Sequence, residues 1–279
     1  MISDRYVETV FNMIEGRDLI LLEKLCITKP FIIKKNDYLN NVKLCERLRF
    51  ASDLDLDFVI VEYQGLKVLD VKKSFNGVPH FTDNYVVAQN NDRFIHLLDL
   101  LVNGSYSLVV IVDSERNVRG VLSKSDLSKH TFVSRVYMSL MYLENLAYFY
   151  VSVFLENGAR DCLKRYNNHF DRKGEKLSKL EDVGLQPMLE FIAVTMLVRD
   201  KCDYEFFNDL NSVNLRVRDI IELRNSVAHP KLFGDSRLVF NAVFIKEFSY
   251  VEAASRDLYK VMEGDARFTT WYQRHFSVG

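Results

Sequence analysis

SLVVIVDSERNVRGVLSKSDL, at residues 107–127, joins an aliphatic run to a polar turn and a second apolar run. The aliphatic residues at 108–112 predict a buried strand. SERN at 114–117 predicts a hairpin turn, and VRGVLS at 118–123 predicts the returning strand. Ser123 and Asp126 then stand where a helix is expected to open.

The same order of segments occurs earlier in the chain. There, strand-forming runs at 31–35, 57–63 and 66–71 surround a helical pattern at 42–51. Aligning Phe31 with Tyr85, and 57–61 with 108–112, gives an offset of about 51 to 54 residues. Repetition at that period predicts two strand–helix–strand–strand–helix units that pack as a pseudo-twofold pair.

Beyond about residue 130 the strand-forming runs are replaced by helical patterns. They cover 133–156, 159–168, 187–200, 213–228 and 241–262. A helical spacing interrupted at Gly16 marks the start of the chain. We therefore expect an α+β protein with a helical lead-in at 1–29, an αβ-repeat module at 30–131 and an all-α domain at 132–279.

Composition excludes several classes of protein. Of 279 residues, 48% are hydrophobic and 27% charged, which excludes a largely disordered or collagen-like chain. A net charge of −1 is too balanced for a protein that coats nucleic acid. The most basic stretch is 160–179, which is either a solvated connector or a local RNA contact; Lys164, Arg165, Arg172 and Lys173 are its candidate RNA-binding residues.

Neither a metal centre nor a membrane anchor is expected. Cys26, Cys45, Cys162 and Cys202 are widely spaced and form no C-x-x-C pair, so they are interpreted as reduced structural thiols. The first residues lack the pattern of a signal peptide, and no apolar run approaches the roughly 20 residues of a membrane span. We expect a cytoplasmic protein with no membrane partner.

The run at 107–127 resembles the end of a cystathionine-β-synthase (CBS) domain, whose closing motif G-x-x-[ST]-x-x-D is matched by Gly120, Ser123 and Asp126. Paired CBS repeats form a sensor module that commonly binds adenine nucleotides. The resemblance implies such a ligand here, with the base pocket lined by Tyr85, Val86 and Val87. A hydroxyl and open backbone N–H groups at a helix start suit phosphate, and a carboxylate suits ribose hydroxyls.

Two alternatives stay open for this module. Ser123 can simply cap the helix, with Asp126 complementing the helix dipole. The first repeat places Val71 and Ser74 where the second has Ser123 and Asp126, so it lacks the ribose carboxylate. We expect one nucleotide site, or a module kept for dimerisation.

Arg224, Asn225 and His229, in the sequence RNSVAHP, resemble the R-x(4–6)-H motif of HEPN domains. These are helical bundles that include many metal-independent ribonucleases, with the active cleft formed between two protomers. The resemblance implies a homodimer in which Arg224 and His229 are catalytic and Asn225 orients phosphate or imidazole. No cofactor is required by such chemistry.

Helical spacing places Arg224 on the stripe that contains Val213, Val217 and Ile220. On the helix at 133–156, Glu144 falls within a stripe made by Tyr137, Met141, Tyr148, Val151 and Leu155. A carboxylate in such a stripe needs a cation, so we expect Glu144 to pair with Arg224. The alternative is a purely structural ion pair, with His229 capping a helix end.

His titrates near neutrality and Arg binds phosphate oxygens in pairs, so these residues suit attack by the ribose 2′-OH. The sequence therefore predicts an adenine-nucleotide-regulated endoribonuclease that yields a 2′,3′-cyclic phosphate, in stress or antiviral defence by resemblance. The alternative is a non-catalytic nucleotide-sensing protein that dimerises or docks a regulatory partner. A further alternative is a partner of a nucleotidyltransferase.

Overall fold

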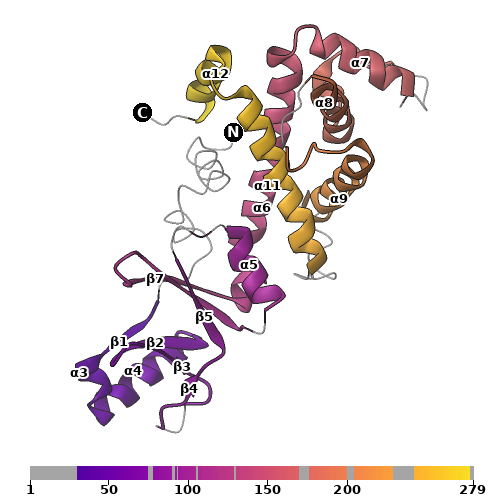
Figure 1. Ribbon diagram of the computed structural model, residues 1–279. Coiled ribbons are helices and arrows are strands. Elements are labelled where there is room, and N and C mark those ends of the chain that lie inside the picture. The colour runs from indigo at the N-terminus through magenta and orange to yellow at the C-terminus, as the bar shows by residue number, and fades with distance from the viewer. Residues whose placement is uncertain are drawn as a thin grey trace. The chain divides into compact units, whose positions relative to one another are not determined.

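The computed structural model describes residues 30–74, 78–89, 92, 94–104, 106–128, 130–169, 176–199, 204–228 and 242–276. It divides into two compact units, one containing the strands up to residue 129 and the other the helices from His130 onward (Figure 1). The chain is thus a mixed α+β protein. The helical lead-in expected at 1–29 lies outside the described residues.

The strand-rich unit contains two sheets with one repeated topology. The first sheet has the order β1 (Ile32–Lys34), β2 (Phe58–Glu62), β3 (Leu66–Asp70) and β4 (Phe81–Thr82), with α3 (Lys35–Tyr38) and α4 (Asn41–Asp53) between β1 and β2. The second has the order β5 (Tyr85–Gln89), β6 (Leu108–Val112) and β7 (Val118–Ser123), with α5 (Phe94–Val102) between β5 and β6. In each, a parallel pair is followed by an antiparallel hairpin. The predicted β-α-β-β repeat is therefore present.

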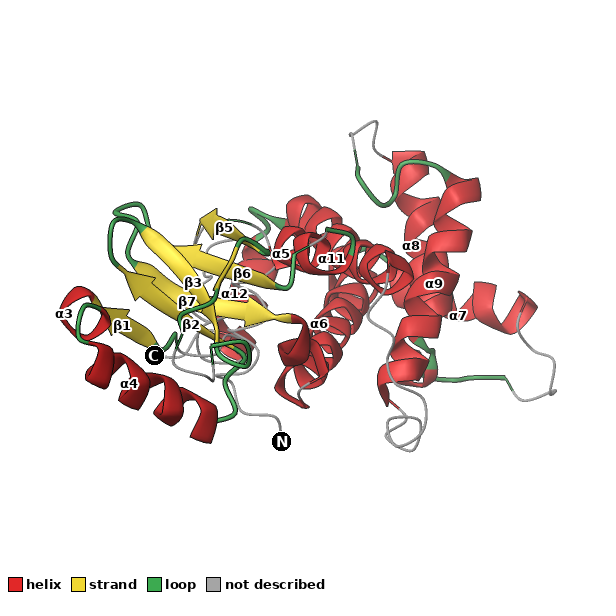
Figure 2. Ribbon diagram, turned by 90° about the horizontal axis from the view of Figure 1, so that it is seen from below, coloured by secondary structure: helices red, strands yellow, loops and turns green. Residues whose placement is uncertain are grey.

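The two sheets pack face to face. Ile60 and Val68 of the first sheet share one buried cluster with Leu108, Val110 and Val112 of β6. On the far side of the first sheet, α4 packs Leu44, Leu48 and Ala51 against it (Figure 2). All five residues of β6 are buried, which explains why its sequence is aliphatic throughout rather than alternating.

The hairpin registers define the structural equivalence of the repeats. Phe58 and Ile60 face the cluster between the sheets, as Leu108 and Val110 do, so Phe58 matches Leu108. Phe58 pairs with Asp70 and Leu108 with Ser123, which makes Asp70 and Ser123 equivalent. The equivalence differs by one residue from the sequence alignment, which had matched Val71 to Ser123. Because strand side chains alternate with a period of two, one residue of shift moves a side chain to the opposite face. Lys73, not Ser74, therefore corresponds to Asp126, and the first repeat still lacks that carboxylate.

The helix expected to close each repeat is reduced. In the second repeat it is a short 3₁₀ helix, η1 (Lys124–Ser128). In the first, residues 71–74 form a turn in which the Ser74 amide donates to the Asp70 carbonyl at 3.0 Å. The buried Ser74 hydroxyl accepts from the His80 amide at 2.9 Å and so holds the chain as it returns toward β4.

The helical unit is a bundle, as the long helical patterns predict. Its helices are α6 (His130–Phe149), α7 (Gly158–His169), α8 (Leu185–Arg199), α9 (Leu210–Ala228), α11 (Ala242–Met262) and α12 (Ala266–Phe276), with a 3₁₀ turn η3 (Leu180–Asp182). Figure 1 shows α6, α8, α9 and α11 lying beside one another, and these four helices contact each other most. The last helix, α12, was not predicted.

A π-helical segment, η2 (Tyr150–Phe154), ends the long α6 helix. Asn157 follows with φ 60°, in the left-handed region that asparagine tolerates, and Gly158 begins α7. A Cβ at Gly158 would collide with the Val151 carbonyl oxygen, so only glycine allows α7 to begin this close to η2.

Asp257 on α11 anchors the segment that precedes α9. It is 5% exposed, and its carboxylate accepts hydrogen bonds from the amides of Glu205, Phe206 and Phe207 at 3.2, 2.7 and 3.1 Å. Burial raises the pKa of this carboxyl, while the three amides act in the opposite direction. The bonds tie positions about 50 residues apart and thereby place the start of α9.

In the described part of the chain, no single helix is long and apolar enough to cross a membrane.

Candidate functional site

The pairing expected between Arg224 and Glu144 is present in the helical unit. Arg224 Nη2 on α9 lies 3.9 Å from Glu144 Oε1 on α6. The buried residues of α9, among them Val217, Ile220 and Leu223, pack its inner face and leave Arg224 at the edge of that face. Packing of α6 on α9 thus brings the two side chains together.

The surroundings of Glu144 differ from the sequence expectation. Within α6 the stripe assigned to it is the less buried side, since Tyr137 is exposed and Met141 and Tyr148 are only partly buried. The last two residues of the stripe, Val151 and Leu155, lie beyond α6 and are buried as expected. Glu144 retains 27% of its side-chain exposure and Arg224 retains 41%. The reason is that the buried face of α6 is turned by about one residue, toward Leu143, Leu146 and Ala147. The pair is consequently half-solvated, and Arg224 keeps donors for a ligand.

Of the remaining predicted catalytic residues, the structure describes Asn225 but not His229. Asn225 follows Arg224 on α9 and is exposed. His229 comes directly after the last residue of α9, Ala228, and lies outside the described residues. The catalytic assignment of both residues stays a prediction.

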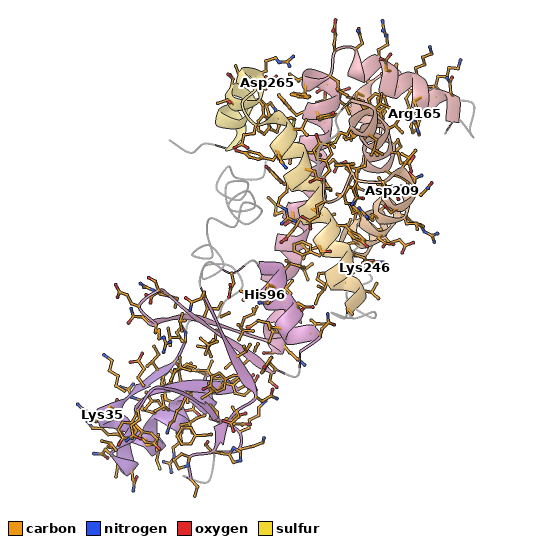
Figure 3. The ribbon with its side chains drawn as sticks, in the orientation of Figure 1. Lys35, His96, Arg165, Asp209, Lys246 and Asp265 are labelled. Carbon is orange, nitrogen blue, oxygen red and sulfur yellow. The ribbon has the colours of Figure 1, made fainter. Side chains whose placement is uncertain are left out.

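A second charged group lies at the contact of α9 and α11. Lys246, labelled in Figure 3, places Nζ 3.1 Å from Asp219 Oδ2. Next to it, Glu247 is half-buried, and burial together with Asp219 and Glu222 raises the pKa of its carboxyl to about 7. This carboxyl titrates near neutrality, and sequence reasoning missed it because no local pattern places Glu247 opposite two carboxylates of α9.

The predicted RNA-binding segment is divided between the described and the undescribed parts of the chain. Lys164 is exposed and Arg165 half-buried on α7, where Figure 3 labels Arg165. Arg172 and Lys173 lie outside the described residues. Asn167, on the same helix, uses its side chain to hold the backbone of Leu177 through two hydrogen bonds of 3.0 Å.

In the strand-rich unit, Ser123 and Asp126 bond to one another. The buried Asp126 carboxylate accepts from the Ser123 amide at 2.7 Å and from the Ser123 hydroxyl at 2.8 Å. A carboxylate that reaches back to the residue preceding a helix is half of a capping box, and it stabilises the start of η1. The sequence alternative assigned the cap to the Ser123 hydroxyl, whereas here the Asp126 carboxylate is the acceptor. Ribose binding by Asp126 stays a prediction.

Ser123 lines a small hollow between the two repeats. The hollow measures about 270 Å³ and also exposes Lys72 and Lys124. Lys72 Nζ lies 2.6 Å from Asp57 Oδ1, and that hydrogen bond raises the pKa of the lysine. Both lysines were missed from the sequence because they come from different repeats and meet only when β3 and β7 end at the same side of the unit.

A larger cleft lies at the other end of β2 and β6, where the two hairpin turns meet. It measures about 680 Å³, and we call it the tip cleft. It is lined by Glu62, Gln64, Gly65, Leu66, Val87, Gln89, Val112, Arg116, Asn117 and Val118. Sequence reasoning used SERN only as a turn signal, so Arg116 and Asn117 were missed as lining residues.

The structure does not bring the predicted nucleotide-binding residues into one pocket. Val87 lines the tip cleft, whereas Ser123 lines the hollow at the opposite strand ends. Val86 pairs with Val109 and Val87 with Val110, so the two valines face opposite sides of the sheet. Gly120 is buried within β7 opposite Ile111 and lines neither pocket.

Two cysteines lie within the described residues, and one of them, Cys162, does not resemble a nucleophile. Cys162 is buried, and burial raises the pKa of its thiol to about 11. Cys45 is half-buried on α4. Cys26 and Cys202 lie outside the described residues. Among the described residues, no group of three metal-ligating side chains is found.

Comparison with known proteins finds no matching family model, no matching curated protein and no matching solved structure. The likeness to CBS and HEPN domains therefore rests on the quoted motifs.

Proposed function

We propose that the protein is a metal-independent endoribonuclease that acts as a homodimer and is regulated by an adenine nucleotide. The observation that supports this most is the half-solvated pair of Arg224 and Glu144, one turn before the end of α9. A guanidinium held by one carboxylate but still open to solvent is suited to receive a phosphate. His229 is the fifth residue after it in the sequence.

In the proposed reaction, the ribose 2′-oxygen attacks phosphorus and the bond from phosphorus to the 5′-oxygen breaks. The 2′-OH proton passes to the imidazole of His229, and a protonated His229 of the second copy donates a proton to the leaving 5′-oxygen. Arg224 stabilises the charge that develops on the phosphate. The products are a 2′,3′-cyclic phosphate and a 5′-hydroxyl, with no oxidant or metal required.

The test is incubation of the purified chain with end-labelled RNA in EDTA. Cleavage with cyclic phosphate ends is expected, and Arg224→Ala and His229→Ala are expected to reduce the rate at least 100-fold. Arg218→Ala is the matched control, because Arg218 is an exposed guanidinium on the same helix that pairs with Glu222. Wild-type rates in Arg224→Ala, or cleavage only with added metal, would refute the proposal.

A second function is favoured by the bonded geometry of Ser123 and Asp126. Because that carboxylate caps η1, the repeats can serve as a structural module, and the chain can be a non-catalytic protein that dimerises or docks a partner. That function predicts no RNA cleavage under any condition. It also predicts that growth inhibition on expression, if observed, persists in His229→Ala.

A further inference from the structure

The tip cleft is more than twice as large as the hollow beside Ser123. Sites for small organic molecules usually measure about 300 to 1,000 Å³, and the tip cleft, at about 680 Å³, falls within that range. The hollow, at about 270 Å³, falls below it. The tip cleft therefore offers a nucleotide more than twice the space of the hollow.

Comparison of the repeats shows what the cleft leaves uncovered. Ile32 pairs with Ile60 in the first sheet as Val87 pairs with Val110 in the second, so Ile32 and Val87 are equivalent. Ile32 packs into the cluster between the sheets, whereas Val87 is 47% exposed. An inward-facing valine stays exposed because the cleft opens there, and a bound apolar group would bury it.

Arg116 is held at the edge of this cleft by a rigid turn. It has φ 65°, an uncommon conformation for arginine, and its amide donates to the Asp113 carbonyl at 3.0 Å. The Asp113 carboxylate accepts from the amides of Glu115 and Asn117 at 2.9 and 2.8 Å. The turn is thus ordered before any ligand arrives, which lowers the entropy cost of binding.

The charged groups of the lining limit the charge of the ligand. Among the residues that line the cleft, Arg116 is the cation and Glu62 the anion, while Gln64 and Gln89 supply carboxamides. The carboxamide nitrogen of Asn117 already donates to the carboxylates of Asp113 and Glu115. One guanidinium can bind a single phosphate, but a triphosphate would bring further negative charges near Glu62. Carboxamides can bond the donor and acceptor edges of a nucleobase.

We propose that the tip cleft, rather than the hollow at Ser123 and Asp126, binds a nucleoside monophosphate, with its phosphate on Arg116 and its base against Val87. The proposal rests on the nucleotide-regulated function only in taking a nucleotide as the ligand. In this proposal the hairpin turns of both repeats form the site, so residues of both repeats contact the same bound ligand.

Calorimetric titration of the full chain with AMP, ATP, adenosine and inorganic phosphate tests the proposal. AMP is expected to bind at least tenfold more tightly than ATP, because of the charge limit, and more tightly than adenosine or phosphate alone. Arg116→Asn is expected to weaken AMP binding at least tenfold, and asparagine is chosen because it accepts a positive φ. Val87→Asp is expected to abolish binding, since it places a carboxylate against the base.

Two further variants distinguish binding in the tip cleft from binding elsewhere on the strand-rich unit. Arg49→Ala removes an exposed arginine of α4 that does not line the cleft, and it should leave AMP binding unchanged. Lys124→Ala should also leave it unchanged, because Lys124 lines the hollow. Loss of binding in Lys124→Ala but not in Arg116→Asn, tighter binding of ATP, or no binding of any nucleotide would overturn the proposal.

Failure of the ribonuclease proposal is distinguishable from failure of this one, because the titration contains no RNA. If AMP binds through Arg116 and RNA is not cut, the nucleotide site stands and the ribonuclease does not. If RNA is cut and AMP does not bind, the reverse holds.

Discussion

Helical spacing and opposite charge predict a pair of Arg224 and Glu144 in the helical unit, and the structure brings them to 3.9 Å. Val87 and Ser123 in the strand-rich unit were assigned to one pocket, and they line two separate ones. Helical side chains turn by about 100° per residue, so an error of one residue moves a side chain to an adjacent face of the helix and not to the opposite one. In a strand the same error reverses the face, so register must be known before a site can be assembled.

The largest expected effect tests this alternation on β5. Ala88→Asp should destabilise the protein by about 3 kcal/mol or more, because Ala88 is 4% exposed and the new carboxylate has no water or partner there. The matched change Val87→Asp, one residue earlier, should cost less than about 1 kcal/mol because that side chain is exposed. Urea unfolding of both variants measures the difference. Equal losses would show that the two positions do not face opposite environments.

The next effect concerns a long-range contact of the helical unit. Asp257→Ala should lower the free energy of unfolding by about 3 kcal/mol, because it leaves three amides without their acceptor in a buried place. Asp257→Asn keeps one acceptor oxygen and should lose less. Thermal unfolding ranks the stability of the two variants. If Asp257→Asn loses as much stability as Asp257→Ala, the hydrogen bonds are not what stabilises this contact.

Asp257 is also an example of a feature that the sequence does not predict. The five long helices and the repeated β-α-β-β order could be predicted, because period and turn residues are local signals. The closing 3₁₀ turn, Arg116 at the tip cleft and the anchor at Asp257 could not, because each depends on segments that meet only in the folded chain. A carboxylate on a helix that accepts bonds from a segment 50 residues away leaves no local pattern.

A smaller effect, confined to high pH, is expected at Glu247. Its pKa of about 7 lies above the ordinary value of 4.5, so the fold favours the protonated form. The stability that this carboxyl contributes is present below about pH 4.5 and is lost as pH rises through 7. Glu247→Gln, which removes the charge facing Asp219 and Glu222, should therefore raise stability by about 1 kcal/mol at pH 8.

The same variant should change nothing at pH 4.5, where Glu247 is already largely protonated. Thermal melts at both pH values measure this, and Glu263→Gln serves as an exposed control near the end of α11. A stabilisation of equal size at both pH values would show that the effect comes from packing and not from titration.

The smallest expected change in stability is at the pair that motivates the ribonuclease proposal. Glu144→Gln should alter the free energy of unfolding by about 0.5 kcal/mol or less, because half-solvated ion pairs contribute little. The RNA cleavage rate should nevertheless fall about tenfold, since the guanidinium of Arg224 is no longer held in one orientation. Unfolding and cleavage are measured on the same preparation. A stability loss above about 2 kcal/mol with an unchanged cleavage rate would make this pair a structural link between α6 and α9. The pair that helical spacing predicts would then have no part in RNA cleavage.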